Sequence, residues 1–417
     1  MSKRVIVIGG GIIGLSSAYY LKQEGFDVTV IDKSGMTGGC SYGNAGYICP
    51  SHFVPMATPG IIKQGFKWML NSKSPFYIQP RLNLSLIDWG FKFIKSATKQ
   101  HVAASAIPLR DIALLSKKLY EEWTQIPGFD FAYKPVGLLE LFKSEENAHH
   151  AEATVKDARA LGLQVRLLNR QQVQDMQPGT NLDILGAVYF GCDAQIHPDK
   201  LMSDLISWLK NNGVRFETNQ EVIGFVNEGS KIKAVSTTTA SFTAGHVVLA
   251  SGVWSRAIAR QLHISLPMVG GRGYSVTLEN STYKVPCPVL LNEARVAISQ
   301  LNDNKIRFGG TMEIVDIRAP LRMNRVQGIL ESVKKYFPDY DIPMPAEKDV
   351  WYGYRPCSAD GLPYIGNTSR YNNVTIATGH SMLGMSLGAA TGKIVSELVA
   401  GKPASLNIKP FDATRFS

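Results

Sequence analysis

The segment 5–21, VIVIGGGIIGLSSAYYL, constrains the fold of this chain more than any other feature. An apolar run at 4–9 predicts a buried parallel strand, and the residues from 12 to 24 predict a helix that follows it directly. Between them Gly9, Gly11 and Gly14 form the pattern G-x-G-x-x-G, which suits a tight turn, a close backbone approach to a pyrophosphate and close helix–strand packing. The free N–H groups at the helix start would bind the phosphates. The sequence therefore predicts a dinucleotide site that comprises Gly9, Gly11, Ile12, Ile13 and Gly14.

An acidic residue follows at the end of the second predicted strand, 27–32. The carboxylate of Asp32 can accept hydrogen bonds from both ribose hydroxyls and would repel a 2′-phosphate. Lys33 stands next to it and is included in the predicted cofactor site. This unit alone does not distinguish NAD from FAD, so the choice depends on the rest of the chain.

The loop after the second strand, GGCSYGNAG at 38–46, favours FAD. It is rich in glycine and has no helical period. A mobile nicotinamide cofactor would not need such a loop at this point of the chain, whereas FAD is extended and its ring system must be enclosed. Its alternative is a plain surface loop. We therefore assign Gly43, Asn44, Ala45 and Gly46 to the predicted FAD site.

Two further segments with small residues complete the predicted FAD site. In VVLASGVWS (247–255) a buried strand delivers a small-residue turn, and in GHSMLG (379–384) small residues precede a helix whose N-terminus would stabilise negative charge on the flavin. His380 is also a candidate catalytic residue, although we assign it no proton transfer and an ordinary polar loop residue is the alternative. The assigned residues are Ser251, Gly252, Trp254, Gly379, His380, Leu383 and Gly384.

The nucleotide-binding pattern thus appears three times, interrupted by two other stretches. Alternation at 132–142 and 266–314 predicts sheet strands, and helices are expected near 106–126, 145–162 and 322–336. We expect an α/β FAD-binding domain of the Rossmann-like, glutathione-reductase type, interleaved with an α+β substrate domain on a mostly antiparallel sheet. The predicted FAD-binding domain comprises 1–60, 195–262 and 345–417, and the predicted substrate domain comprises 61–194 and 263–344.

Composition excludes few classes but sets the expected compartment. The five cysteines show neither metal-ligand nor redox spacing, so reduced thiols and no metal site are expected. No apolar run reaches the roughly 18 residues that a membrane span needs. The chain enters its first strand at once, which favours a cytoplasmic location. The net charge of +10 leaves open an RNA-binding flavoprotein in tRNA modification, but no RNA-binding module is visible and no nucleic acid is expected.

Taken together, GGGIIGLSSAYYL with its following acid, the GNAG loop, VVLASGVWS and YRPCSADGLPYIG…GHSMLG resemble the D-amino acid oxidase-like flavoprotein superfamily, and within it bacterial D-amino acid dehydrogenases. The resemblance runs from Lys3 to about Gly401. It implies non-covalent FAD and oxidation of an amine beside a carboxylate. It also implies that Arg355, in GYRPCSADG, pairs with the substrate carboxylate, because a guanidinium matches a carboxylate fork. A structural ion pair is the alternative for this residue.

Two departures from the family pattern qualify this resemblance. Sarcosine-oxidase relatives attach FAD to a cysteine where this chain has Tyr354, so no covalent link is expected. Related oxidases often carry a substrate-facing tyrosine where this chain has Val296-Ala297-Ile298. Tyr274, in GRGYSV, is the candidate to supply a hydroxyl instead, with a packed core tyrosine as the alternative.

The resemblance implies hydride transfer from a D-amino acid to flavin N5, followed by hydrolysis of the imine to a 2-oxo acid. D-Proline and hydroxy-D-proline are the candidate cyclic substrates, and the electrons are expected to pass to a quinone or another non-oxygen acceptor. A hydrogen peroxide-forming glycine or sarcosine-type oxidase is the alternative.

The stretch 61–101 is basic and aromatic, and it bears on the acceptor. In LIDWGFKFIKSATK (86–99) Leu86, Ile87, Trp89 and Phe93 can share a helical face. The lysines of this segment, Lys92, Lys95 and Lys99, would lie elsewhere on the helix. That pattern is typical of a helix at an anionic membrane surface. We expect peripheral contact with the inner face of the plasma membrane; the alternative is that these aromatic residues fill the core of the substrate domain.

Overall fold

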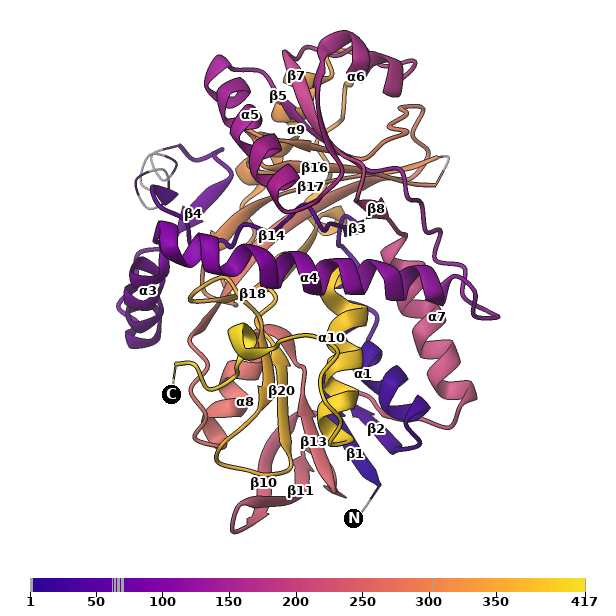
Figure 1. Cartoon of the computed structure of the whole chain (residues 1–417), viewed down its shortest axis with the longest axis vertical. Helices are drawn as coiled ribbons and strands as arrows, with labels where there is room; N and C mark the ends of the chain where they lie inside the picture. The colour runs from indigo at the N-terminus through magenta and orange to yellow at the C-terminus, as the bar shows by residue number, and fades with distance from the viewer. Residues whose placement is uncertain are drawn as a thin grey trace.

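The computed structural model describes residues 3–61, 63, 65, 68, 71–302 and 304–416. Two large sheets lie at opposite ends of the molecule, and the long helix α4 (Lys99–Trp123) runs between them (Figure 1). Part of the basic stretch falls outside this description, namely Ile62, Gln64, Phe66, Lys67, Met69 and Leu70.

The first sheet has six strands in the order β19-β20-β13-β1-β2-β9. Its central strands are parallel, with Val5 to Ile8 of β1 aligned with His246 to Leu249 of β13 and with Val28 to Ile31 of β2. These strands are continuous apolar runs because both faces of the sheet are covered. Their bounds are β1 Arg4–Ile8, β2 Asp27–Ile31, β9 Arg215–Glu217, β13 His246–Leu249, β19 Tyr364–Asn367 and β20 Val374–Thr378.

Helices α1 (Ile12–Gln23), α10 (Gly384–Val399), α4 and α7 (Pro198–Asn211) form one layer on one face of this sheet. Every residue of α1 from Ile12 to Tyr20 is buried, as expected for a helix enclosed on all sides. It contacts α10 so closely that a Cβ on Gly392 would lie 2.4 Å from the Ser16 carbonyl carbon. Helices α4 and α7 complete this layer.

A small antiparallel sheet and a short helix lie beside the first sheet. The small sheet joins β10 (Val222–Glu228), β11 (Lys231–Thr237) and β12 (Ser241–Thr243). Their apolar side chains share a core with those of α8 (Ser255–Gln261) and the first sheet. The short 3-10 turn η1 (Gly252–Trp254) leads into α8.

The second sheet has nine strands in the order β18-β14-β17-β16-β15-β5-β7-β6, with β4 paired to β17. Most neighbours are antiparallel, and α9 (Met323–Tyr336) packs on one face. Helices α5 (Glu145–Ala160) and α6 (Arg170–Met176) pack at its far end. Its strands are β4 Phe76–Ile78, β5 Leu138–Phe142, β6 Val165–Asn169, β7 Gly186–Phe190, β14 Met268–Leu278, β15 Val289–Leu291, β16 Val296–Asn302, β17 Lys305–Ile314 and β18 Trp351–Ser358.

This architecture confirms the predicted fold class, in which segments distant in sequence alternate between two sheets. Strand β18 and helix α4 each belong by residue number to one predicted domain but pack with the other. Strand β18 falls within 345–417 but pairs with β14 in the nine-stranded sheet. Helix α4 falls within 61–194 but packs against α10 and α1 in the other half. The two-stranded pairing of β3 (Tyr47–Ile48) with β8 (Ala194–Gln195) joins the halves.

Helix α3 (Leu84–Ser96) differs from its predicted orientation. Trp89 is buried and donates a hydrogen bond to the carbonyl of Cys357, while Leu86 and Phe93 pack into the same small core. The predicted interfacial face is therefore wrong for these three residues, because the underside of the substrate sheet covers them. A different apolar face of α3 is exposed, as described below.

All five cysteines are free thiols. Within the described residues, none of the helices has both the length and the apolar composition that crossing a membrane requires.

Candidate active site

A cavity of about 1180 Å³ lies between the two large sheets and runs from the first glycine turn to the nine-stranded sheet. It exceeds the size of most small-molecule sites, so an extended ligand and a second small molecule fit together. Most of the predicted site residues line it, from all three predicted segments: Gly9, Gly11, Ile12, Ile13, Asp32, Lys33, Gly43, Asn44, Ala45, Ser251, Gly252, Trp254, Tyr274, Arg355, His380, Leu383 and Gly384.

The other three predicted glycines support the cavity from behind. A Cβ on Gly14 would lie 1.8 Å from the carbonyl oxygen of Gly9, one on Gly46 would lie 2.2 Å from that of Ile196, and one on Gly379 would lie 2.6 Å from the ring of Tyr364. Each glycine therefore permits a close backbone approach that positions the lining residues.

The first glycine turn presents free backbone N–H groups to the cavity. Gly9 has a φ of 114°, a conformation that favours glycine. The N–H groups of Gly9, Gly10 and Ile12 are already bonded, to the Ile31 carbonyl, to the Asp32 carboxylate and, at 3.0 Å, to the Ser41 hydroxyl. Helix α1 has no side-chain cap, so among the described residues the N–H groups of Gly11 and Ile13 stay open to the cavity. An uncapped helix N-terminus that lines a cavity is an anion site. Sequence analysis did not identify Ser41, since only the fold brings it to this turn.

Asp32 is fixed in place beside this turn. Its carboxylate accepts hydrogen bonds from the Gly10 N–H at 2.7 Å and from the Ser34 N–H and hydroxyl at 2.8 and 2.7 Å. The ammonium of Lys33 lies 3.8 Å from the centre of the Trp254 ring, in a cation–π contact. Both side chains thus belong to one wall of the cavity.

The GNAG loop is fastened to the nine-stranded sheet. Arg307 donates from Nη1 to the carbonyls of Tyr42 and Asn44 at 2.8 and 2.7 Å, and the Ser299 hydroxyl donates to the Ala45 carbonyl at 2.6 Å. These contacts hold the loop between the two halves of the molecule, which excludes the alternative of a plain surface loop.

His380 lies at the entry to α10 and is neutral. It is buried, its Nε2 lies 3.0 Å from the Thr391 hydroxyl, and burial lowers its pKa from 6.5 to about 3. The N-terminus of α10 has no side-chain cap, so its N–H groups are available to a ligand in the cavity.

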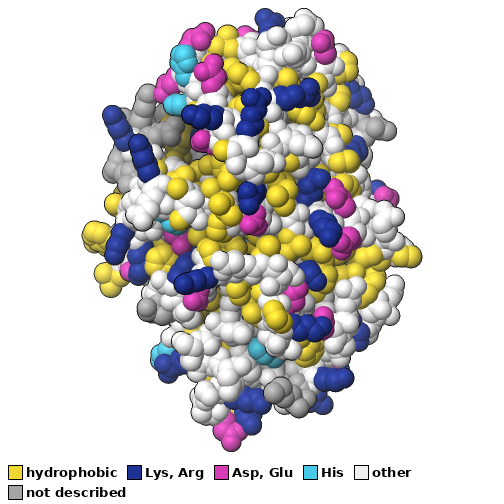
Figure 2. Space-filling model, viewed as in Figure 1, with side chains coloured by type: hydrophobic (Ala, Val, Ile, Leu, Met, Phe, Trp, Pro, Cys, Tyr) yellow, Lys and Arg dark blue, Asp and Glu magenta, His cyan; other side chains and the backbone are white. Residues whose placement is uncertain are grey.

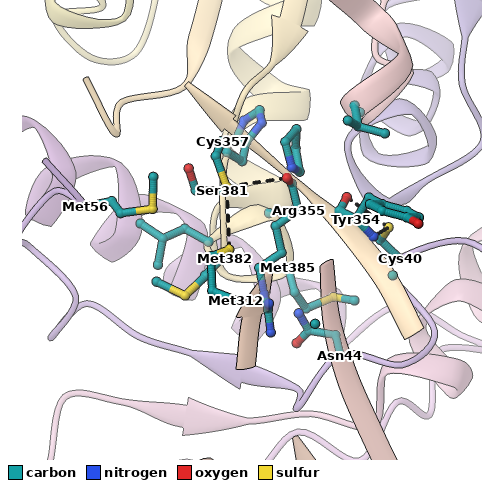
Figure 3. A pocket seen from close by; sticks show the side chains of 18 of the residues that line it. Cys40, Asn44, Met56, Met312, Tyr354, Arg355, Cys357, Ser381, Met382 and Met385 are labelled. Atoms are coloured by element: carbon teal, nitrogen blue, oxygen red, sulfur yellow. Dashed lines mark hydrogen bonds between the residues drawn. The ribbon is translucent and has the colours of Figure 1, made fainter. Parts of the chain in front are cut away.

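Arg355 extends from β18 into the cavity beside Met312 and Asn44 (Figure 3). One hydrogen bond positions it, from Nη1 to the carbonyl of Thr311 at 2.7 Å. The guanidinium covers Gly273, where an added Cβ would lie 2.2 Å from Nη1. Burial lowers its pKa, and within the described residues it forms no ion pair. Arg355 is partly buried, and a cavity-lining guanidinium without a counter-ion is set to receive an anion.

Tyr274 borders the cavity, but its side chain packs on the opposite face of the same sheet. Its hydroxyl donates to Glu313 at 2.6 Å, and its ring packs in the core against α9. The hydroxyl therefore already has an acidic partner. The predicted substrate contact for Tyr274 finds no support in this geometry, which matches the core alternative.

The far end of the cavity holds polar residues that sequence analysis did not identify. Glu140 of β5, Asn292, Arg295 and His52 line it. Burial raises the pKa of Glu140 from 4.5 to about 7, with nearby Arg295 opposing the rise and Asp193 adding to it. These residues come from separate segments, so only the fold brings them together.

A cluster of possible metal ligands lies next to this end. The ligand atoms of Cys49, His52 and Asp193 all lie within 4.8 Å of one another. Both carboxylate oxygens of Asp193 already accept hydrogen bonds from Ser51, at 3.1 Å from its N–H and 2.6 Å from its hydroxyl. The predicted absence of a metal site stays a prediction.

Comparisons with known proteins decide the family. The model of the DAO family, FAD dependent oxidoreductase, matches residues 4–398. The chain belongs to this family. A D-amino acid dehydrogenase from Helicobacter pylori is 31% identical over 95% of both chains, and one from Neisseria meningitidis serogroup C is 29% identical over 99% of both.

A solved structure shows the same DAO-family fold. The crystal structure of glycine oxidase from Geobacillus kaustophilus superimposes with a TM-score of 0.80 at 23% identity, covering 99% of both chains. The predicted superfamily and the predicted FAD cofactor are thus confirmed.

The residues of this DAO-family chain fit FAD along the whole cavity. The uncapped start of α1 suits the pyrophosphate, and Asp32 at the end of β2 suits the ribose. Gly11 leaves open space, since a Cβ there would meet only the Ser41 hydroxyl at 3.6 Å. The GNAG loop and the uncapped start of α10 are placed to enclose the ring system.

Proposed function

We propose that this enzyme is an FAD-dependent D-amino acid dehydrogenase. The observation that carries the proposal is Arg355, a partly buried guanidinium without a counter-ion among the described residues, in the cavity that fits FAD. A carboxylate beside the reacting amine would supply the missing anion. The relatives named above as D-amino acid dehydrogenases, which match nearly the whole chain, support the same choice.

The chain contributes binding and orientation to this reaction. FAD, when bound, accepts the electron pair of the substrate's α-C–H bond. Arg355 binds the substrate carboxylate and so holds the substrate in the orientation that the reaction requires. His380 is neutral in the buried cavity, and its contact with Thr391 anchors the entry to α10. The product imine then reacts with water. An acyclic imine gives a 2-oxo acid and ammonia, whereas the cyclic imine of a proline opens to an amino-2-oxo acid that keeps its nitrogen.

Anaerobic bleaching of the flavin tests this proposal. Purified holoenzyme is mixed with a panel of D-amino acids, their L-enantiomers and N-methylglycine, and the flavin absorbance is followed. We expect bleaching by D-amino acids, with D-proline and hydroxy-D-proline as the candidate cyclic members, and none by the L-enantiomers. Preferential bleaching by N-methylglycine or L-amino acids would contradict the proposal.

A peroxide-forming oxidase is the second candidate. The likeness to glycine oxidase supports a shared fold but does not by itself favour this activity. The two differ in the electron acceptor. With oxygen as sole acceptor, we expect peroxide to form much more slowly than a soluble quinone analogue is reduced. Peroxide release at the full rate of turnover would favour the oxidase.

We further propose that the acceptor is a membrane quinone and that α3 contacts the membrane. Leu84, Ile87, Phe91 and Ile94 recur every three or four residues along α3 and are exposed, and Phe91 is 71% accessible. Lys95 of α3 and Lys99 at the start of α4 are also exposed. Hydrophobic side chains protrude where α3 lies, at the left edge of Figure 2, with basic side chains nearby. Exposed apolar residues flanked by cations suit an anionic lipid surface.

Co-sedimentation with vesicles tests this contact. We expect binding to vesicles that contain anionic lipid. The double variant Phe91→Ser, Ile94→Ser should weaken this binding by about tenfold, since each substitution removes apolar side-chain area that would insert into the lipid. Leu167→Ser, at another exposed apolar residue on β6, is the matched control and should bind as the wild type does. Equal sedimentation of both variants would contradict a role for α3.

A further inference from the structure

The end of the cavity away from the glycine turn contains a carboxylate without a partner. Glu140 lies on β5 and lines the cavity. Within the described residues its carboxylate forms no hydrogen bond and no ion pair, although the residue is partly buried. The neighbouring side chains on its strand, Leu139 and Leu141, point to the opposite face and pack in the core beneath α9. A partly buried carboxylate that faces open space accepts a hydrogen bond from whatever enters.

The groups around Glu140 define the polarity of that space. Arg295, on the turn between β15 and β16, lies close enough to oppose the rise in the pKa of Glu140 and to lower that of His52, but it makes no ion pair with Glu140. Burial is the main reason that the pKa of His52 falls to about 4, so its imidazole is neutral. Asp193 also faces this region, but Ser51 engages both of its oxygens.

Uncharged polar groups complete the surroundings. Asn292 contributes an amide from the same turn as Arg295, and Asn147, His150 and Thr154 of α5 lie at the edge of the cavity. Glu140 is thus the carboxylate at this end that still lacks a donor, among the described residues. Arg295 offsets the negative charge of Glu140, so the space has no net need of a cation. A neutral hydroxyl can donate to Glu140 and accept from its neighbours.

We infer that Glu140 determines substrate specificity by accepting a hydrogen bond from a hydroxyl on the substrate's side chain. This inference rests on the proposed function, because it takes Arg355 as the site of the substrate carboxylate. It assigns the substrate to the hydroxylated members of the D-amino acids.

Strand register places Glu140 on the cavity face of the nine-stranded sheet. Glu140 pairs with Leu290, which pairs with Ala297, which pairs with Gly309. All four residues line the cavity, as do Thr311 on β17, whose carbonyl positions Arg355, and Arg355 itself. One cavity therefore contains both the Arg355 guanidinium and the Glu140 carboxylate.

Matched substrate pairs test the inference. The pairs are D-proline with cis-4-hydroxy-D-proline and D-alanine with D-serine, and D-norvaline with D-ornithine tests for a cation. The measured quantity is the ratio of kcat/KM within each pair. We expect the wild type to prefer the hydroxylated members, and Glu140→Leu to reduce that preference by about tenfold or more, mainly through KM. Glu140→Gln, which still accepts a hydrogen bond, should restore part of it.

Controls separate this inference from folding and from the proposed function. Glu146→Gln changes an exposed carboxylate on α5 and should leave every ratio as in the wild type. FAD content and the visible spectrum report folding of each variant. An unchanged ratio in Glu140→Leu, or a wild-type preference for D-ornithine, would overturn the inference while D-proline turnover keeps the proposed function. If no D-amino acid reduces the flavin, the proposed function fails and the inference fails with it.

Discussion

Two arginines on adjacent strands of the nine-stranded sheet have opposite surroundings. Arg272 on β14 is fully buried and paired with Glu313, which is also fully buried, at 2.8 Å, and it donates to the carbonyls of Ala319 and Pro320 at 2.7 and 2.9 Å. Arg355 on β18 pairs in register with Gly271, the neighbour of Arg272. It has one backbone acceptor and faces the cavity.

The difference lies in which face of the sheet each guanidinium occupies. Arg272, Glu313, Arg325 and Tyr274 form a closed cluster, in which Arg325 also donates to the Ser74 carbonyl at 2.6 Å and so fastens the chain before β4. Arg272 and Arg325 share the carboxylate of Glu313 as their anion, and both also donate to backbone carbonyls, so each guanidinium has acceptors within the protein. Arg355 lacks an anionic partner among the described residues, and this deficiency is what makes it suitable for a ligand.

The largest expected effect comes from opening the closed cluster. Glu313→Gln would leave Arg272 and Arg325 buried without an anion, and we expect a loss of about 3–5 kcal/mol in the free energy of unfolding. Urea titration of the holoenzyme measures it. Glu331→Gln removes an exposed carboxylate that pairs with Lys73 at 2.6 Å and should cost less than about 1 kcal/mol. Equal losses in the two variants would mean that the closed cluster does not stabilise the fold.

Removing the open guanidinium should instead affect catalysis. For Arg355→Met we expect kcat/KM for D-amino acids to fall by about 100-fold, which corresponds to about 3 kcal/mol, because the substrate carboxylate loses its charged donor. FAD content and stability should remain close to those of the wild type. Arg318→Met, at an exposed arginine before α9, is the control. A proportional loss with an amine that lacks a carboxylate would contradict the role of Arg355.

This contrast also explains how far the sequence could predict the site. Local patterns were sufficient to single out the glycine turn and Asp32 at the end of β2, since each depends on a few adjacent residues, whereas the family resemblance singled out Arg355. Asp32 and Arg355 both line the cavity. A structural ion pair was the alternative for Arg355. Such a pair occurs instead at Arg272 on the next strand, whose partner Glu313 lies 41 residues away. No local pattern distinguishes these two arginines.

Other misses have the same physical cause. The helical period of 86–99 correctly predicted an amphipathic helix, but α3 has two apolar faces, and tertiary contacts decide which one is buried. The strand around 132–142 was predicted, but no local pattern indicated a role for Glu140. Arg295 and Asp193, which influence its pKa, lie on other segments of the chain. Strand β18 joins the substrate sheet because its pairing with β14 is long-range.

The smallest expected effect is a pH dependence at the cavity's other unpartnered charge, Glu140. Its pKa of about 7 in the folded protein exceeds its ordinary value of 4.5, so the folded state binds more protons than the unfolded state between these values. Glu140 therefore stabilises the fold most at low pH, and this contribution is lost as the pH rises to about 7. We expect the free energy of unfolding of the wild type to fall relative to Glu140→Gln over this window by on the order of 1 kcal/mol. Thermal unfolding at a series of pH values measures the difference. The control Glu146→Gln should show the same pH dependence as the wild type. Parallel curves for Glu140→Gln and the wild type would show that an internal partner neutralises Glu140, as Glu313 neutralises Arg272.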